Sequence, residues 1–431
     1  MIRLETADGD FATRFDALVD ARRETAVDVA CDVATIIRAV RDDGDAALHA
    51  FTQKLDRHDL NDTGWRLDAA ACAAAFAGLE PELRAALELA AARIRTYHEK
   101  QRPEDTAFTD AAGVRLGARW RAVDAAGIYV PGGRAAYPST LLMNAIPARV
   151  AGVERLVVVT PTPDGVVNPL VLAAAHLAQA DEVWRVGGAQ AIAALAYGTE
   201  RIARVDVVTG PGNAWVAEAK RQVYGVVGID MVAGPSEIVV VADGANDPDW
   251  IAADLLSQAE HDTTTQSILF TDDGEFATRV ADAVMAQLET LPTAAVARVA
   301  WEDNGAIVVV PTLMDAMPLV DRLAPEHVEL ACDDPQALFD RLRHAGSAFL
   351  GRHTPEAIGD YVAGPNHVLP TGRRARFASG LGVTDFMKRT SFLQLDESAL
   401  SELGPATIAL AEAEGLPAHA RSVALRIRIN H

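Results

Sequence analysis

Residues 205–225 read VDVVTGPGNAWVAEAKRQVYG, which is an apolar run, a glycine-rich turn and then an amphipathic segment. The β-branched apolar run predicts a buried strand, and the segment after the turn predicts a helix. A strand, a Gly-x-Gly turn and a helix form the arrangement that directs backbone N–H groups at a pyrophosphate. The turn GPGNAW lacks the third glycine of the GxGxxG fingerprint, so by itself it does not decide what is bound there.

The same alternation continues on both sides of this unit. Short apolar segments alternate with helical patterns such as 214–225, 249–262 and 275–291. This alternation predicts α/β architecture with largely parallel sheets. The expected strands are Arg155–Thr160, Glu182–Val186, Val205–Thr209, Glu237–Ala242, Ser267–Thr271, Ala306–Val310 and Ser347–Leu350.

The two ends of the chain have a different pattern. The first hundred residues predict long helices over 27–55 and 70–100, with a polar break between them. After Gly380 there are only a weak strand signal and a helical segment over 406–415. Because this tail carries too little apolar surface to fold alone, we expect it to dock on the main body or on a second copy of the chain.

Composition excludes several classes of protein. The 431 residues include 39 Lys and Arg against 60 Asp and Glu, a formal net charge of −21, which disfavours binding to nucleic acid or an anionic membrane. No apolar run is long enough to span a bilayer, and the acidic start has no signal-peptide pattern. Three widely spaced cysteines (Cys31, Cys72 and Cys332) form neither a disulfide framework nor a CxxC site, so we expect a cytoplasmic protein.

Pairs of polar residues mark candidate sites, although each pair has an ordinary alternative. Gln258 and His261 lie three residues apart on one helical face and could bind a metal or a substrate, or simply end a solvated helix. Glu326 and His327 follow a proline, are expected in a loop, and form an acid–base pair that could also be plain surface.

Each of three further features, taken alone, also allows either a functional or an ordinary structural interpretation. Asp360 and His367 flank a turn built by Gly and Pro, which suits ligand binding or merely precedes a strand. Glu414 and His419 flank a Gly-Leu-Pro step in the tail and could project into a site or belong to a disordered terminus. The glycine-rich turns in 127–137 and 186–190 could approach the same ligand as residues 210–213.

Taken in their order along the chain, eight segments resemble those of the histidinol dehydrogenase family, and the resemblance runs from about Val27 to Ile429. The segments are GIYVPGG, VGGAQAIAALAYGT, TGPGNAWV, DMVAGPSE, LLSQAEHD, LAPEHVEL, GDYVAGPNHVLPT and EGLPAHARSVALR. The resemblance implies oxidation of L-histidinol to L-histidine through L-histidinaldehyde, with two NAD⁺ reduced, as the last step of histidine biosynthesis. It also implies a homodimer with one Zn²⁺ in each active site, and a site that the two subunits share.

The resemblance also implies a role for each matching residue. The Zn²⁺ ligands would be Gln258, His261, Asp360 and, from the partner subunit, His419. His327 would be the general base, and Glu326 would activate water for hydration of the aldehyde. These ligands and His327 would contact the substrate together with Ser236, His367 and Glu414, whereas the cofactor contacts would be Tyr129, Gln190 and Asn213.

The implied fold has two Rossmann-like α/β domains, an N-terminal helical region and a C-terminal extension that docks on the partner. We expect a helical arm over 1–25, a catalytic and metal-binding domain from 26–128 plus 239–380, an NAD-binding domain over 129–238, and a dimerisation tail over 381–431. Two rival functions use parts of the same residue set. A zinc hydrolase leaves the glycine-rich turns unexplained, and a periplasmic-type binding protein would need a signal sequence.

Overall fold

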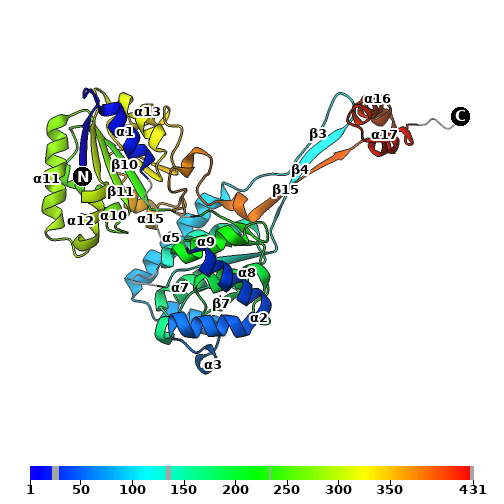
Figure 1. Cartoon of the computed structure of the whole chain (residues 1–431), viewed down its shortest axis with the longest axis horizontal. Helices are drawn as coiled ribbons and strands as arrows, with labels where there is room; N and C mark the ends of the chain where they lie inside the picture. The colour runs from blue at the N-terminus through cyan, green and yellow to red at the C-terminus, as the bar shows by residue number, and fades with distance from the viewer. Residues whose placement is uncertain (22–28, 133–136, 233, 428–431) are drawn as a thin grey trace.

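A computed structural model describes residues 1–21, 29–132, 137–232 and 234–427. Figure 1 shows two α/β lobes and an arm that projects away from them and ends in two helices. Each lobe is built on a six-stranded sheet, here sheet A and sheet B, and the arm is built on a three-stranded sheet C. Among the described residues, no helix combines the length and the apolarity that a membrane span requires.

Sheet A is parallel throughout, because every neighbouring pair of its strands runs in the same direction. Its spatial order is β1 (Ile2–Glu5), β12 (Ala306–Val309), β11 (Gln266–Thr271), β10 (Glu237–Ala242), β13 (His327–Ala331) and β14 (Ser347–Leu350). The helices of this lobe are α1 (Phe11–Asp20), α10 (Pro248–Ala259), α11 (Gly274–Leu288), α12 (Ala294–Asn304), α13 (Leu313–Leu323), α14 (Pro335–Phe339) and α15 (Glu356–Tyr361).

The central strand β10 explains why sheet A is covered on both faces. All six of its residues are buried, which is typical of a parallel sheet between two helix layers. Because side chains alternate along a strand, Ile238 and Val240 pack in one hydrophobic cluster and Val239 and Val241 in another on the opposite face.

Sheet B repeats this design, and only its edge strand β2 runs antiparallel to its neighbour. Its order is β2 (Arg66–Leu67), β7 (Glu182–Trp184), β6 (Arg155–Val159), β5 (Ala125–Tyr129), β8 (Val207–Thr209) and β9 (Gly228–Ile229). Its helices are α2 (Ala30–Asp56), α3 (Leu60–Thr63), α4 (Ala69–Ala77), α5 (Pro81–Glu99), α6 (Pro138–Ala151), α7 (Pro169–Leu177), α8 (Gly188–Tyr197) and α9 (Ala214–Val223), with a 3₁₀ turn η1 (Pro163–Gly165).

Both sheets share one topology, which confirms the expected Rossmann-like class. When five strands of each sheet are numbered along the chain, their spatial order is 3-2-1-4-5, with β1 or β2 added at one edge. The order reverses between β10 and β13 in sheet A and between β5 and β8 in sheet B. In such sheets the crevice beside the reversal is where ligands usually bind.

The arm is formed by segments far apart in the sequence. Strands β3 (Thr106–Thr109), β4 (Arg115–Ala122) and β15 (Met387–Gln394) pair antiparallel, and α16 (Glu397–Ala413) and α17 (Pro417–Ala424) lie at its tip (Figure 1). Two more 3₁₀ turns, η2 (Arg374–Arg376) and η3 (Val383–Phe386), precede β15. Large apolar side chains on the arm are exposed, among them Phe108 at 61%, Leu393 at 68% and Leu410 at 66%. Surface of this kind is typical of a binding interface.

The seven strands expected from the sequence are present, with ends that shift by up to two residues. The strand pairing departs from the expected domain division in two places. Residues expected as a helical arm include β1, which extends sheet A. The span 26–128, expected in the catalytic domain, contributes β2 and most of β5 to sheet B and α2 to the lobe of sheet B. Part of the expected arm, residues 22–25, lies outside the described residues.

Candidate active site

A cavity of about 300 Å³ between the lobes brings together predicted residues from distant parts of the sequence. Sheet B contributes the turn Gly210–Gly212 at the carboxyl end of β8, and sheet A contributes residues at the amino ends of β10 and β13. The predicted residues that line this catalytic cavity are Ser236, Gln258, His261, Glu326, His327, Asp360 and His367.

His327 is positioned by β13, and Glu326 lies in the bend directly before that strand. His327 is the first residue of the strand and is aligned with Ile238 of β10, so the expected loop placement was wrong for this residue. The apolar residues Val328 and Leu330 alternate after it and are fully buried, which draws the segment into the sheet. The acid–base pair therefore lies on a rigid strand end.

The His327 imidazole is buried and held in one orientation. Its Nδ1 lies 3.1 Å from the backbone oxygen of Glu237, and because a carbonyl can only accept, Nδ1 donates this hydrogen bond. That leaves Nε2 as the proton-accepting nitrogen, 3.6 Å from Glu356 Oε1. Burial lowers the pKa of His327 to about 4, so the ring is neutral at pH 7.

The neighbouring carboxyl groups are shifted in the opposite direction. Burial raises the pKa of Glu326 well above its usual value, although the carboxylate accepts a hydrogen bond of 3.0 Å from the backbone N–H of Glu237. Burial, with the charge of Asp360 second, raises the pKa of Glu356 to about 8. A carboxyl group with a pKa near that of Glu356 can both accept and release a proton close to neutral pH.

The donor set for a metal is partly assembled in the single chain. Gln258 is fully buried, and within the described residues neither its Oε1 nor its Nε2 has a hydrogen-bond partner. Ligand atoms of His327, Glu356 and Asp360 lie within 4.8 Å of one another, and His261 lines the same cavity. Unpaired buried amide atoms beside carboxylate and imidazole groups suit a divalent cation that takes mixed N and O ligands.

His367 is fixed at the cavity wall by two contacts. Its Nδ1 donates to the backbone oxygen of Asp360 at 2.9 Å, and its Nε2 lies 3.3 Å from Thr140 Oγ1. Burial lowers the pKa of His367, so it enters the site as a neutral ring. Asp360 thus contributes its backbone oxygen to His367 and its carboxylate to the cavity.

Glu414 and His419 do not join this cavity in the single chain. Both are exposed at the tip of the arm, beside and within α17, far from the lobes in Figure 1. The expectation that Glu414 lies off a helix holds, because α16 ends at Ala413, whereas His419 lies in the first turn of α17. Their action in the site of a second subunit remains a prediction.

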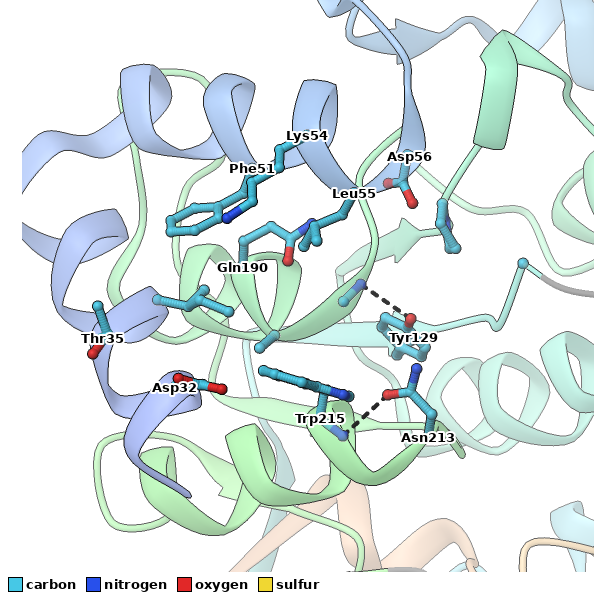
Figure 2. A pocket seen from close by; sticks show the side chains of 15 residues that line it. Asp32, Thr35, Phe51, Lys54, Leu55, Asp56, Tyr129, Gln190, Asn213 and Trp215 are labelled. Atoms are coloured by element: carbon cyan, nitrogen blue, oxygen red, sulfur yellow. Dashed lines mark hydrogen bonds between the residues drawn. The ribbon is translucent and has the colours of Figure 1, made fainter. Parts of the chain in front are cut away.

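A second cavity, of about 530 Å³, contains the three predicted cofactor residues (Figure 2). Tyr129 ends β5, Gln190 lies in the first turn of α8, and Asn213 caps α9, so all three stand beside the reversal of strand order in sheet B. The Tyr129 hydroxyl accepts from the Gly188 N–H at 3.1 Å, and Gln190 Oε1 is buried without a partner in the described part of the chain. The Gly133 of the predicted turn lies outside the described residues.

Lys220, which the sequence did not mark as a candidate, and Asp230 both line the catalytic cavity. Lys220 and Asp230 form a buried ion pair, and they hold both backbone groups of Gly210. Lys220 Nζ donates to the Gly210 oxygen at 2.9 Å, while the Gly210 N–H donates to Asp230 at 2.9 Å. The pair therefore fixes the turn whose residues line the catalytic cavity and lead to Asn213.

Replacing Lys220 by Met is expected to lower the free energy of unfolding by about 3–5 kcal/mol, because Asp230 would keep a buried charge without its partner. Urea denaturation followed by circular dichroism measures this change. Arg298→Met removes the partly exposed pair with Glu289 and serves as the control, with an expected change of about 1 kcal/mol or less. An equal effect of the two substitutions would contradict a fixing role for the buried pair.

The arrangement matches that of known proteins along almost its whole length. The sequence model of histidinol dehydrogenase matches residues 20–427. The chain is 62% identical over 427 residues to histidinol dehydrogenase of Zymomonas mobilis, with 99% of each chain covered. The Rhodospirillum rubrum enzyme of that name is 61% identical over 427 residues, covering 99% of this chain and 98% of the relative. A crystal structure of histidinol dehydrogenase from Elizabethkingia anophelis superimposes with a TM-score of 0.94 at 34% identity, covering 99% of this chain and 98% of that one. The chain therefore belongs to the histidinol dehydrogenase family.

Proposed function

We propose that the protein oxidises L-histidinol to L-histidine through L-histidinaldehyde, using two NAD⁺, as the last step of histidine biosynthesis in the cytoplasm. The observation that carries this proposal is the meeting of the two sheets at one cavity. The amino end of β13 supplies the acid–base pair, and the carboxyl end of β8 supplies the turn that continues into the cofactor cavity. A redox reaction between a substrate and a dinucleotide needs this adjacency.

The buried Gln258 and the carboxylate of Asp360 support a Zn²⁺ site, with His261 as the third ligand and His419 of the partner subunit as the fourth. Zn²⁺ bound there would hold the imidazole and amino nitrogens of the substrate and so orient it. Further contacts to the substrate would come from Ser236, His367 and Glu414 of the partner subunit.

In the first half-reaction His327 takes the alcohol proton at Nε2 while the carbinol C–H leaves as hydride to NAD⁺. The neutral state that burial imposes on the ring supports this role, since only a neutral imidazole can accept the proton. The alcohol loses one proton and one hydride, which gives the aldehyde and NADH. The donor bond from Nδ1 to the Glu237 oxygen keeps Nε2 directed at the cavity.

In the second half-reaction water adds to the bound aldehyde, and a second hydride leaves to a second NAD⁺. Glu326 accepts the proton of the attacking water, and the burial that raises its pKa well above its usual value strengthens it as a base. The gem-diolate formed in this way loses a hydride to NAD⁺ and one further proton, which yields the carboxylate. Keeping the aldehyde inside the cavity prevents its side reactions.

A homodimer is supported by the arm. It exposes Phe108, Leu393 and Leu410 far from the lobes, and it carries Glu414 and His419 at its tip. An exposed apolar arm that ends in two potential ligands is suited to reach the cavity of a second copy. Among the described residues of one chain, His419 does not line the catalytic cavity, and the arm of a second copy would supply it.

The stoichiometry of NADH formed per L-histidinol consumed tests the proposed reaction. We expect two NADH per substrate, loss of activity on treatment with a zinc chelator, and recovery when Zn²⁺ is restored. One NADH with release of free aldehyde would show that the second half-reaction, and the role given to Glu326, is wrong. Activity without NAD⁺ would favour the zinc hydrolase instead.

A further inference from the structure

Asp56 faces the cofactor cavity, and no role has been assigned to it so far. It is the last residue of α2 and lines the 530 Å³ cavity together with Tyr129 and Gln190. Figure 2 shows its carboxylate on the same side of the cavity as the Tyr129 ring. Its Oδ2 is buried, and no hydrogen-bond partner for this oxygen is found among residues 1–21, 29–132, 137–232 and 234–427.

The placement of this carboxylate is unfavourable for folding. A negative charge at the carboxyl end of a helix opposes the helix dipole, and Asp56 ends the part of α2 that follows a kink at Gly44. Burial raises its pKa to about 6, against the charge of the adjacent Arg57. The Arg57 guanidinium is itself engaged by Asp164, at 2.7 Å and 2.6 Å. The presence of a carboxylate in these unfavourable surroundings is better explained by a role in ligand binding than by a contribution to stability.

The position of the carboxylate is nevertheless well fixed. The two residues after Asp56 both contact the 3₁₀ turn η1 or the residue before it. The Arg57 guanidinium donates to Asp164 in η1, and His58 Nδ1 lies 2.8 Å from Thr162 Oγ1 just before η1. Arg57 adopts a left-handed conformation with φ of 53°, which turns the chain sharply at the helix end. The loop that carries these anchors also lines the cavity through Pro161.

The neighbours of Asp56 indicate which part of a dinucleotide it meets. Burial, with a smaller contribution from the charge of Asp56, raises the pKa of Tyr129 to about 12, so the two groups are close. Tyr129 in turn accepts from the N–H of Gly188, the first residue of α8. The N-cap of this ten-residue helix is Gly187, which supplies no capping side chain, and Gln190 in its first turn has an unpaired buried oxygen. The start of a helix without a capping side chain suits a pyrophosphate.

We propose that Asp56 accepts hydrogen bonds from the hydroxyl groups of the adenosine ribose and thereby selects NAD⁺ over NADP⁺. The inference rests on the NAD⁺ dependence proposed above. In a dinucleotide the groups next to the pyrophosphate are the two riboses, whose hydroxyls are neutral donors. A carboxylate accepts from a 2′-hydroxyl and repels a 2′-phosphate, which is how acidic residues read this position in Rossmann-like folds.

The test compares Asp56→Asn with the wild type in kcat/KM for NAD⁺ and NADP⁺, and in the Kd of both by calorimetry. A hydrogen bond to a charged group corresponds to a roughly 10- to 100-fold change in affinity. We expect kcat/KM and affinity for NAD⁺ to fall about tenfold or more, and the preference for NAD⁺ over NADP⁺ to shrink by at least as much. The melting temperature without ligand should stay the same or rise, whereas a purely structural carboxylate would leave it lower.

Three further measurements test whether the effect on cofactor preference is specific to Asp56. Asp42→Asn makes the same charge change on the exposed face of α2 and should leave all values unchanged. Asp32→Asn removes the other carboxylate of the cavity, and a loss of selectivity there but not in Asp56→Asn would overturn the proposal. Wild type should use nicotinamide hypoxanthine dinucleotide, which lacks the adenine amine, nearly as well as NAD⁺. A much lower kcat/KM for this analogue than for NAD⁺ would place Asp56 on the adenine amine instead.

Failure of the proposed function gives a different result from failure of this inference. If the wild type reduced neither cofactor in the presence of L-histidinol, the proposed reaction would be wrong. If it reduced NAD⁺ and the Asp56→Asn protein kept the same NAD⁺ affinity and the same rejection of NADP⁺, only the role of Asp56 would be wrong.

Discussion

Replacing His327 by Asn is expected to lower kcat about 10³-fold, within the range found for removal of a general base. The amide nitrogen of Asn can still donate to the Glu237 oxygen, as Nδ1 does at 3.1 Å, so the local structure should persist. The nitrogen that faces Glu356 at 3.6 Å is lost, and with it the acceptor for the alcohol proton. Steady-state kinetics with L-histidinol should show the loss in kcat, with little change in KM for NAD⁺.

A matched control can show that the fall in kcat of His327→Asn comes from the lost chemistry and not from misfolding. His353→Asn changes an exposed imidazole that contacts Trp250 at a tilted angle outside both cavities, and it should keep wild-type kinetics. Circular dichroism and the melting temperature should be close to wild type in both variants. A fall in kcat of less than tenfold for His327→Asn would mean that another group takes the proton, and Glu326 would be the next candidate.

The parts of the fold that the sequence predicted are those with a strong local signal. The run EIVVVA is apolar at every position after Glu237, so β10 was expected with its observed ends. β13 was missed because its polar residues His327 and Glu329 alternate with apolar ones and follow a proline, which resembles a loop. β1 has four residues, and nothing local distinguishes it from the start of a helical arm.

The geometry of the site could not be predicted without three-dimensional information. Sequence spacing brings Gln258 and His261 together, but it does not tell which edge of sheet A they face. In the structure they share a cavity with the amino ends of β10 and β13, whereas ligands in such sheets usually bind at the carboxyl ends. That edge is used because the carboxyl end of β8 in sheet B faces it. Only the packing of two lobes decides this.

Glu356 shows a signal that was present in the sequence but was not used. It lies four residues before Asp360 on α15, so both carboxylates share one helical face. Its proximity to His327 follows from the pairing of β13 with the strand before α15, which is a long-range contact. Local spacing alone therefore indicates a pair of acids, whereas their meeting with His327 depends on tertiary structure.

The proposed sharing of the active site between two subunits predicts the second large effect. His327→Ala and His419→Ala should each reduce activity about 10³-fold as pure homodimers, because one removes the proposed base and the other a proposed metal ligand. Co-expression with two different tags and purification on both tags gives mixed dimers only. If the tip of each arm serves the partner subunit, one of the two sites in a mixed dimer combines an intact His327 with an intact His419, and activity should recover to about half of wild type.

The alternative geometry predicts no recovery, which makes the result decisive. If α17 folded back onto its own chain, every site of the mixed dimer would carry one defect. A matched control pairs His327→Ala with Glu326→Gln, two residues that both lie at the amino end of β13 in the same lobe. That mixture should stay inactive under either geometry, so recovery confined to the His419 mixture would place the exposed tip of the arm in the partner's cavity. Recovery in neither mixture would show that Glu414 and His419 act in their own chain or outside the site.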